Sequence, residues 1–285
     1  MTPYAEVIGQ PVGQSKSPAI HEFWLQKLGL NARYERTAIG EERLPMHLDR
    51  RRNEEHWRGC NITMPLKQAV LPLLAGNLSP EAETIRAVNT IVRTSGGKLS
   101  GHNTDAAGFL EPLLPILAQR HWLRMARVLG TGGAARAVVH ALGQHGFTIV
   151  LAGRNLAKAR TLLDELAADG EHHAVHLDHF AAPTDFAFDD REGCLDLIVN
   201  ASPLGMRGQP PLAFDWSHAP PGSIAYDIVT DPVRTPFLQA AEKAGFRTID
   251  GLHMLIGQAA LAFELFFGKA PPRQHDAELR ALLTR

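Results

Sequence analysis

The chain has little of what marks an exported, membrane or nucleic-acid-binding protein. Only two of its 285 residues are cysteine, Cys60 and Cys194, which is too few for a disulfide framework and lacks the paired spacing of a zinc site. The formal net charge is −1, so no global field attracts nucleic acid or an anionic membrane. No apolar run approaches the roughly 20 residues that span a bilayer. The 14 histidines are scattered, so no ligand cluster predicts a metal site.

The remaining composition is that of an ordinary globular protein. The hydrophobic fraction is 45% and the charged fraction 21%, and the length suits one large or two ordinary domains. The first residues lack the basic and apolar regions of an export signal, which favours a cytoplasmic location. We expect both cysteines to be buried as small hydrophobic residues. The run Arg50 to Arg52 is followed by Glu54 and Glu55, which predicts a solvated helix face of mixed charge.

Short apolar strands alternate with helical patterns along the chain, and this pattern restarts once. In the first part we expect strands at 4–9, 33–39 and 60–63, a hairpin of 87–93 and 98–102, and a helix at 18–28 with Ser17 as its N-cap. A long helix is expected over 105–119. Strands are then expected at 124–129, 147–152, 195–200, 223–227 and 247–250, with helices at 135–144, 157–168, 236–244 and 254–267. Such alternation predicts two α/β domains, the second with a doubly wound, mostly parallel sheet of the Rossmann type.

We place the domain boundary just before Asp105. Residues 1–104 form the predicted substrate-binding domain, and helices within 253–285 return to it. Residues 105–252 form the predicted dinucleotide-binding domain. The sequence leaves a monomer and a homodimer equally open.

A glycine-rich segment lies between a predicted strand and a predicted helix, the context that a dinucleotide-binding loop requires. It reads Gly130-Thr131-Gly132-Gly133-Ala134-Ala135. Gly130 permits the tight turn, Gly132 and Gly133 let backbone approach a pyrophosphate, and a small residue follows at the helix start. The helix N-terminus supplies unpaired N–H groups for phosphate. The alternative is a tight turn without a ligand.

The next strand ends in residues that favour NADP over NAD. An NAD-binding loop usually places an acidic residue there, which accepts a hydrogen bond from the ribose 2′-hydroxyl. This chain has no acid at that place and instead carries Arg154 and Lys158, which can face a 2′-phosphate. The alternative is that both are solvated charges at the start of a helix, although cations are disfavoured there without an anion nearby.

Four polar clusters lie at or near strand ends in the first part of the chain. They are Ser15-Lys16-Ser17-Pro18, Asn61 to Lys67, Ala87 to Thr90, and Asn103-Thr104-Asp105. An α/β fold presents its ligand-binding groups at such places. Each cluster also has an ordinary structural explanation, because Ser17 and Asp105 can cap helices and Lys67 can be a solvated helix residue.

Taken together, these segments resemble the shikimate dehydrogenases, and the resemblance spans nearly the whole chain. The stretch Gly9 to His21 is similar to the family's opening signature, and the other three polar clusters are similar to its next blocks in the same order. Gly130 to Arg136 resembles its cofactor loop. Asn200 to Met206 and Gly251 to Gln258 resemble its later blocks.

The resemblance implies a role for each matching residue. Lys67 and Asp105 would be the catalytic pair. Ser15 and Ser17 would donate to the substrate carboxylate, and Thr63, Asn89 and Gln258 would contact the ring hydroxyls. Ile228 and Gly251 would line the nicotinamide pocket, while Gly130, Gly132, Gly133, Ala134, Arg154 and Lys158 would hold the rest of NADP.

Two residues depart from the family's pattern. Gln14 stands where the family commonly has histidine, and Thr230 stands where it usually has a substrate-binding tyrosine. Threonine's hydroxyl sits on a much shorter side chain, so we do not expect it to reach the substrate carboxylate directly. The resemblance therefore leaves the ring acid open between shikimate and a relative such as quinate.

The implied chemistry is reversible hydride transfer between NADPH and the ketone of 3-dehydroshikimate, a step of aromatic amino-acid biosynthesis. Hydride addition builds negative charge on the carbonyl oxygen, which needs a positioned proton donor. A lysine is protonated at neutral pH and can donate. The alternatives are a paralogue that oxidises quinate or another polyhydroxy ring acid, a non-catalytic sensor of NADP or a shikimate-like ligand, and a folate dehydrogenase of similar plan.

Overall fold

The structure, a computed structural model, describes residues 2–74, 76–189 and 191–284. The chain divides into two compact units. Unit 1 comprises Met1–Asp105 and Ile256–Arg285, and unit 2 comprises Ala106–Leu255. The sequence-based boundaries were placed at 104/105 and 252/253, and the second structural division falls inside helix α10 (Gly251–Phe267).

Unit 1 is built on a five-stranded sheet of order β2-β1-β3-β4-β5. Its strands are β1 (Tyr4–Gly9), β2 (Arg33–Ala38), β3 (Trp57–Ile62), β4 (Thr90–Arg93) and β5 (Leu99–His102). The first three in sequence are parallel, so their carboxyl ends share one edge, and β4 and β5 extend the sheet as an antiparallel hairpin. Segments that follow β1 and β3 therefore meet at the same edge of the sheet.

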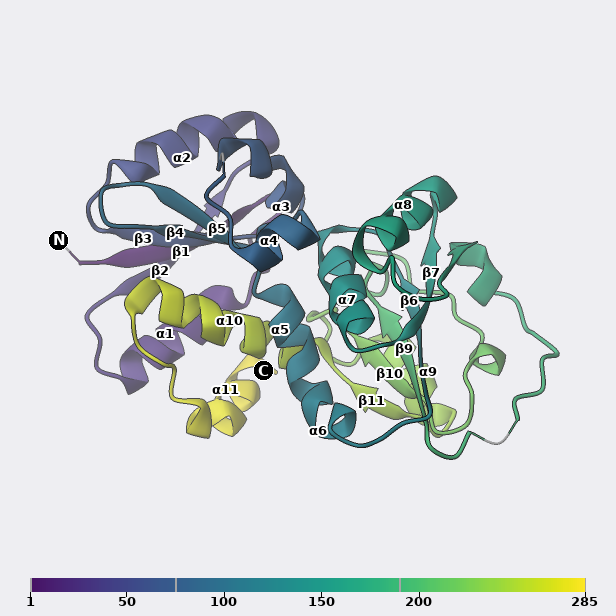
Figure 1. Ribbon diagram of the computed structural model, residues 1–285. Helices are drawn as coiled ribbons and strands as arrows, with labels where there is room; N and C mark the ends of the chain where they lie inside the picture. Colours follow the sequence, from purple (N-terminus) through teal and green to yellow (C-terminus); the bar gives the residue numbers. More distant parts are fainter. Residues whose placement is uncertain (1, 75, 190, 285) are drawn as a thin grey trace. The chain divides into compact units, whose positions relative to one another are not determined.

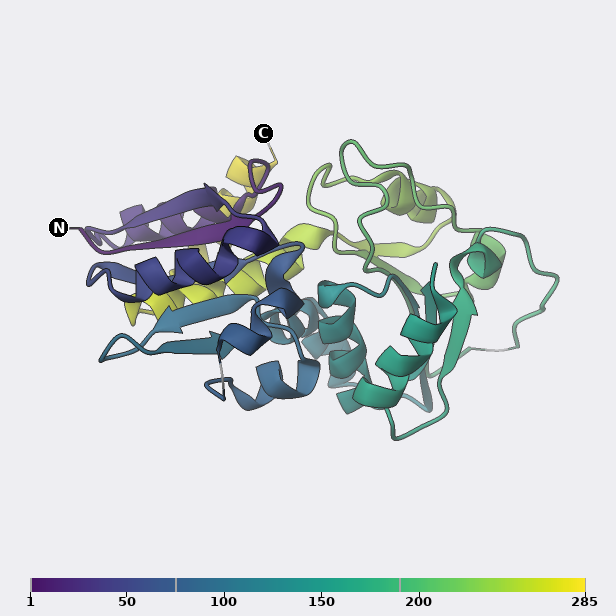
Figure 2. The ribbon, with the colours of Figure 1, turned by 90° about the horizontal axis from the view of Figure 1, so that it is seen from above.

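Helices cover both faces of this sheet, as Figure 1 shows for α2 on one face and for α1 and α10 on the other. The helices of unit 1 are α1 (Ser17–Lys27), α2 (Leu44–Arg52), α3 (Leu66–Ala69), α4 (Pro80–Ile85), the second part of α10, and α11 (Asp276–Leu283). Alternate residues of β1 point to opposite faces. Accordingly, Ile8 packs in the cluster with Leu44 of α2, and Val7 packs in another with Phe266 of α10. Both views place α11 beside α1 (Figures 1 and 2), where Lys27 pairs with Glu278 at 2.8 Å.

Unit 2 contains a six-stranded, all-parallel sheet of order β11-β10-β9-β6-β7-β8. Its strands are β6 (Leu123–Leu129), β7 (Thr148–Gly153), β8 (His173–His176), β9 (Cys194–Asn200), β10 (Ile224–Asp227) and β11 (Arg247–Ile249). Its helices are α5 (Asp105–Leu110), α6 (Leu114–Leu117), α7 (Gly133–Gln144), α8 (Leu156–Leu166) and α9 (Pro236–Lys243), with the start of α10. The strand order reverses at β6, which confirms the predicted doubly wound architecture. The edge strand β8 was not predicted.

Two sequence-based expectations about helices were wrong. Ser17 is not the N-cap of α1 but its first residue; Lys16 is the cap, and the Ser15 hydroxyl oxygen accepts from Ser17 N at 3.3 Å. The long helix expected over 105–119 is instead α5, a 3₁₀ turn at Glu111–Leu113 and α6. Pro112 and Pro115 lack the N–H that a continuous helix would need, which explains the break.

The prediction of a solvated face for Arg50 to Arg52 was wrong for Arg51. Its guanidinium is 15% exposed and pairs at 2.9 Å with Glu6, which is fully buried in the middle of β1. Trp57 and His47 also hydrogen-bond the Glu6 carboxylate, at 2.9 and 3.1 Å. Burial acts to raise the pKa of Glu6, but the hydrogen bonds from His47 and Thr37 and the nearby charge of Arg51 outweigh it and lower that pKa. Of the two cysteines, Cys60 is buried and Cys194 is half-buried, so the expectation for Cys194 was also too strong.

Candidate active site

Lys67 and Asp105 form an ion pair in unit 1, with Lys67 Nζ 2.5 Å from Asp105 Oδ2. Their side chains are 15% and 5% exposed, so the lysine side chain is partly accessible to solvent while the carboxylate is almost enclosed. Lys67 lies on the short helix α3, and Asp105 begins α5, directly after the hairpin. A paired lysine that keeps solvent access can exchange a proton with a bound ligand.

Asn89 fixes the other oxygen of the Asp105 carboxylate. Its Nδ2 donates to Asp105 Oδ1 at 2.8 Å and to Thr104 Oγ1 at 2.9 Å, and it lies 3.4 Å from Gln258 Oε1. The amide orientation is set because Thr104 N donates to Asn89 Oδ1 at 2.8 Å. Four of the residues predicted from the resemblance, Lys67, Asp105, Asn89 and Gln258, therefore lie in one cluster in unit 1.

Backbone contacts explain how distant segments hold this cluster. Val88 N donates to the Lys67 carbonyl at 2.8 Å, which ties the start of the hairpin to α3. Asn103 donates to the Ala87 carbonyl at 2.8 Å and accepts from Asp105 N at 3.0 Å. Asn103 thus has the turn-shaping role that its sequence position allowed. The three polar clusters 61–67, 87–90 and 103–105 are therefore linked in turn.

Sequence reasoning treated Asn61, Thr90 and Thr104 only as members of motifs. Asn61 Oδ1 accepts from the Tyr34 hydroxyl at 2.5 Å, and Asn61 Nδ2 donates to Thr90 Oγ1 at 3.0 Å. The Thr90 hydroxyl donates to Asn89 Oδ1 at 3.0 Å. These buried contacts support the face of Asn89 that turns away from Asp105. The sequence could have indicated these residues, because they are hydrogen-bonding residues at otherwise apolar strand positions.

Ser15 and Ser17 form a second group on the loop after β1, joined by the Ser17 N to Ser15 Oγ hydrogen bond. Lys16, between them, donates to the Leu283 carbonyl at 2.6 Å. Thr63 lies beside the end of β1: a Cβ on Gly9 would come within 2.4 Å of Thr63 Cγ2, so only glycine fits there. Among the described residues, no hydrogen bond joins these serines directly to the Lys67 cluster.

In unit 2 the glycine-rich loop follows β6 and opens α7. Gly130 has φ +125°, and a Cβ on it would lie 2.6 Å from the Ala201 carbonyl oxygen, so this turn requires glycine. Gly132 is the N-cap of α7, and a Cβ there would meet nothing within 4 Å. Gly133 and Ala134 form the first turn of the helix. Position 132 is therefore not crowded by other protein atoms, and the N–H groups in the first turn of α7 have no preceding helical carbonyl, which suits a phosphate.

Arg154 and Lys158 lie at the start of α8, after β7. Both are exposed, and Lys158 N is capped by the Asn155 side chain at 3.0 Å. In the described part of the chain neither cation has a carboxylate within ion-pair distance. Two cations near a helix N-terminus without an acidic partner are electrostatically suited to an anion.

Ile228 and Gly251 are also neighbours in unit 2. A Cβ on Gly251 would lie 2.7 Å from the Ile228 carbonyl oxygen, so α10 begins in direct contact with the end of β10. Asp227, which sequence reasoning did not select, holds this segment by accepting from Val229 N at 2.9 Å and Thr235 Oγ1 at 2.6 Å. Burial raises the pKa of Asp227 to about 6. Thr230 is half-buried two residues beyond Ile228.

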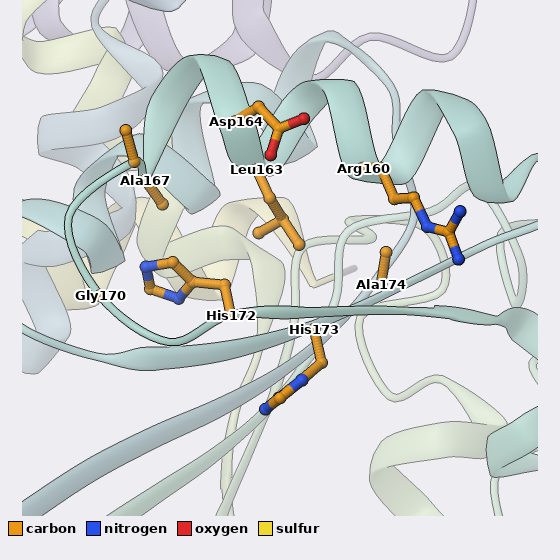
Figure 3. Close-up of a pocket in the computed structure, with 9 residues that line it drawn as sticks. Arg160, Leu163, Asp164, Ala167, Gly170, His172, His173 and Ala174 are labelled. Atoms are coloured by element: carbon orange, nitrogen blue, oxygen red, sulfur yellow. The ribbon is translucent and has the colours of Figure 1, made fainter.

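A separate pocket of about 360 Å³ lies between α8 and the segment that leads into β8 (Figure 3). His172 and His173 line it from below, and Arg160 and Asp164 line it from α8. None of the predicted site residues belongs to its lining. Within residues 2–74, 76–189 and 191–284, no group of three His, Cys, Asp or Glu side chains is placed to hold a metal ion.

Comparison with known proteins shows to which family the chain belongs. The model of the shikimate dehydrogenase substrate binding domain matches residues 7–91, and the model of the shikimate 5'-dehydrogenase C-terminal domain matches residues 251–278. A shikimate dehydrogenase (NADP(+)) from Sphingopyxis alaskensis is 47% identical, over 99% of this chain and 97% of that protein. The chain belongs to the shikimate dehydrogenase family.

Solved structures agree with this membership of the shikimate dehydrogenase family. Shikimate 5-dehydrogenase from Thermus thermophilus, in complex with NADP(H) and shikimate, matches with a TM-score of 0.78 and 36% identity, covering 99% of this chain and all of that one. A quinate dehydrogenase from Corynebacterium glutamicum, in complex with NAD, matches with a TM-score of 0.80 and 33% identity over 99% of both chains. The predicted resemblance is therefore confirmed.

Proposed function

We propose that this chain catalyses the reversible, NADPH-dependent reduction of 3-dehydroshikimate to shikimate, within aromatic amino-acid biosynthesis. The Lys67–Asp105 pair carries the proposal, because a sensor or binding protein has no need of a solvent-accessible lysine paired with a carboxylate. The 47% identical relative bears the name of this activity.

The residues of unit 2 fit a dinucleotide. The pyrophosphate would bind at the N-terminus of α7, where the cap residue Gly132 is not crowded, and Arg154 and Lys158 would face the 2′-phosphate. Ile228 and Gly251 would line the nicotinamide pocket. NADPH, when bound, supplies the hydride.

Lys67 would supply the proton. As charge develops on the carbonyl oxygen of the substrate, the Lys67 ammonium would donate to that oxygen, and Asp105 would hold the ammonium in position. In the oxidation direction the neutral amine would accept the hydroxyl proton, so that direction is favoured by rising pH. Asn89 and Gln258, which converge on the same pair, would contact the ring hydroxyls.

Ser15 and Ser17 would bind the ring carboxylate at the start of α1, where hydroxyl donors and a helix N-terminus both favour an anion. Thr63, on the segment beside Gly9, would contact a ring hydroxyl. We place the reaction in the cytoplasm, which suits a chain whose cysteines Cys60 and Cys194 are both free. In the described part of the chain no helix is long and apolar enough to cross a membrane.

One assay tests this function. Reduction of NADP⁺ and NAD⁺ is measured with shikimate and with quinate, and we expect the fastest turnover with shikimate and NADP⁺. Faster turnover of quinate would favour the quinate-oxidising alternative, which the shorter side chain of Thr230 leaves open. No reduction with any of the four pairs would favour the sensor. We propose a monomer or a homodimer, which sedimentation of the purified protein distinguishes.

A further inference from the structure

The Arg36 side chain hydrogen-bonds the loop that carries Ser15 and Ser17. Its Nε and Nη2 donate to the Ser15 carbonyl oxygen at 3.2 and 2.8 Å. Nothing in the sequence patterns singled out Arg36, because it lies inside a strand rather than after one. The structure brings it to a loop that is 21 residues away in the chain.

The position of Arg36 on the sheet places it at the edge where the ligand groups lie. Arg36 is the register partner of Val7, two residues before the end of β1, and the two strands are parallel. Tyr34, two residues earlier on β2, packs with Val7 in the cluster under α10, so Arg36 shares that face and extends it toward the carboxyl edge. The loop of Ser15 leaves from this same edge.

Arg36 also differs from the neighbouring arginines in its acidic partners. Arg33, Arg50 and Arg51 each have a carboxylate within 3.3 Å. Across the described ranges, Arg36 has no ion pair, and its guanidinium is exposed. A guanidinium has five N–H donors in a planar fork, and the Ser15 carbonyl uses only two of them. The remaining donors, including both on Nη1, can meet an anion.

We infer that Arg36 is a specificity-determining residue that selects substrates carrying a carboxylate. Its guanidinium supplies positive charge and a planar donor pair to the carboxylate held by Ser15 and Ser17. This inference rests on the proposed function, since it assigns a residue to the same substrate.

The test compares an acid with its neutral analogue. Shikimate and shikimate carboxamide are used with NADP⁺, and KM and kcat are measured for the wild type, Arg36→Gln, Arg36→Lys and Arg33→Gln. Glutamine at position 36 keeps a donor for the Ser15 carbonyl but removes the charge. Arg33→Gln is the matched control, because it removes one charge from the opposite end of the same strand.

We expect Arg36→Gln to raise the KM for shikimate roughly five- to thirtyfold, as for loss of a charge-assisted contact that is partly screened by solvent. The KM for the carboxamide stays within about twofold, and kcat changes little, because the contact is made equally before and during the reaction. Arg36→Lys is intermediate, and Arg33→Gln is unchanged. Rising salt should erode the preference for the acid in the wild type and much less in Arg36→Gln.

Two results would overturn the inference. An equal rise in KM for acid and carboxamide means that Arg36 only positions the loop, and no change for either means that it does not act on the substrate. Calorimetric titration with shikimate separates this inference from the proposed function. If the wild type binds shikimate without turning it over, and Arg36→Gln binds it more weakly, the proposed function is rejected and the role of Arg36 is kept. If the wild type does not bind shikimate, both are rejected.

Discussion

Lys67 and Asn89 contact the same carboxylate from opposite sides: Lys67 Nζ lies 2.5 Å from Asp105 Oδ2, and Asn89 Nδ2 lies 2.8 Å from Asp105 Oδ1. Asp105 therefore cannot rotate without breaking one of these contacts. Because Asn89 is itself oriented by Thr104 N, residues that flank the β4–β5 hairpin hold the carboxylate that pairs with the Lys67 ammonium.

Replacement of Lys67 by alanine should remove proton transfer and leave cofactor binding intact. We expect turnover to fall about 10²- to 10⁴-fold, the range for loss of a general acid–base group. NADPH affinity, measured by fluorescence titration, should stay within about twofold, since Lys67 lies in unit 1 and the predicted cofactor residues in unit 2. Lys98→Ala, at an exposed hairpin position, is the control. Retained turnover in Lys67→Ala would remove Lys67 from the mechanism.

Replacement of Arg154 by alanine should change the choice of cofactor. The guanidinium is exposed at the start of α8, where only NADPH would offer a phosphate. We expect NADPH to bind roughly ten- to a hundredfold more weakly, as for loss of a charge-assisted contact, and NADH to change much less. Arg160→Ala, at an exposed position within α8, is the matched control. Equal weakening of both cofactors would refute a contact with the 2′-phosphate.

His21 should make the protein less stable as the solution becomes acidic. It is fully buried, its ring stacks on Tyr34 at 4.0 Å between centroids, and neither ring nitrogen has a hydrogen-bond partner among the described residues. Burial lowers the pKa of His21 from 6.5 to about 3. Below pH 6.5 the unfolded chain therefore takes up a proton that the folded chain excludes. The free energy of unfolding should fall by about 1.4 kcal/mol per pH unit from this group as pH drops from 6.5 toward 3.

The variant His21→Phe isolates that contribution. Phenylalanine keeps an aromatic ring and removes two unpaired polar atoms, so we expect stabilisation by about 1–3 kcal/mol at pH 7. The gain should grow as pH falls, measured by urea unfolding between pH 7 and pH 4. His173→Phe, at an exposed site, should show no such growth. Asp227 has the opposite effect on the pH dependence of the unfolding free energy, because its pKa is raised to about 6 and its stabilisation is lost as pH rises through that value. This effect is the same in the wild type and in His21→Phe, so it cancels in the comparison.

Replacing Arg51 alone should destabilise the fold much more than replacing both members of the Glu6–Arg51 pair. Arg51→Met leaves the fully buried Glu6 carboxylate without its arginine, and we expect a loss of about 3–5 kcal/mol in the free energy of unfolding. The double variant Glu6→Leu with Arg51→Met should recover most of that loss, since no buried charge remains. Arg50→Met, on the exposed side of the same helix, should cost less than about 1 kcal/mol. A double variant as unstable as Arg51→Met would show that the network stabilises the fold by itself.

The sequence predicted most strands of unit 2 because they are continuous apolar runs between glycine- and helix-forming segments. It failed where a side chain's environment depends on a distant segment. Arg51 lies in a charged run that is typical of a solvated helix, and only the fold reveals that Glu6 of β1 lies beneath it. The helix expected over 105–119 failed for a local reason, because Pro112 and Pro115 inside it lack the N–H groups that a continuous helix needs.

The residues of the candidate site also divide into those that the sequence could predict and those that only the fold brings to the site. Lys67 and Asp105 follow strand ends and Asn89 lies just before β4, so their clustering at strand termini could be expected from an α/β fold, and the resemblance to the family named them. Tyr34, Thr90 and Arg36 lie within strands, where sequence alone gives a polar residue no direction. Their relation to the site depends on strand order and register, which bring β2 beside β1 and β4 beside β3.

The hydrogen bond from Lys16 to the Leu283 carbonyl has a practical consequence for handling the protein. The last turn of α11 is tied to the residue between the two serines, so proteolytic trimming after Arg280 would remove this anchor of the loop after β1, which Arg36 also holds. We expect a clipped preparation to keep its nucleotide affinity and to bind the ring acid more weakly. Mass spectrometry of each batch would therefore tell a damaged sample from one with a changed substrate preference.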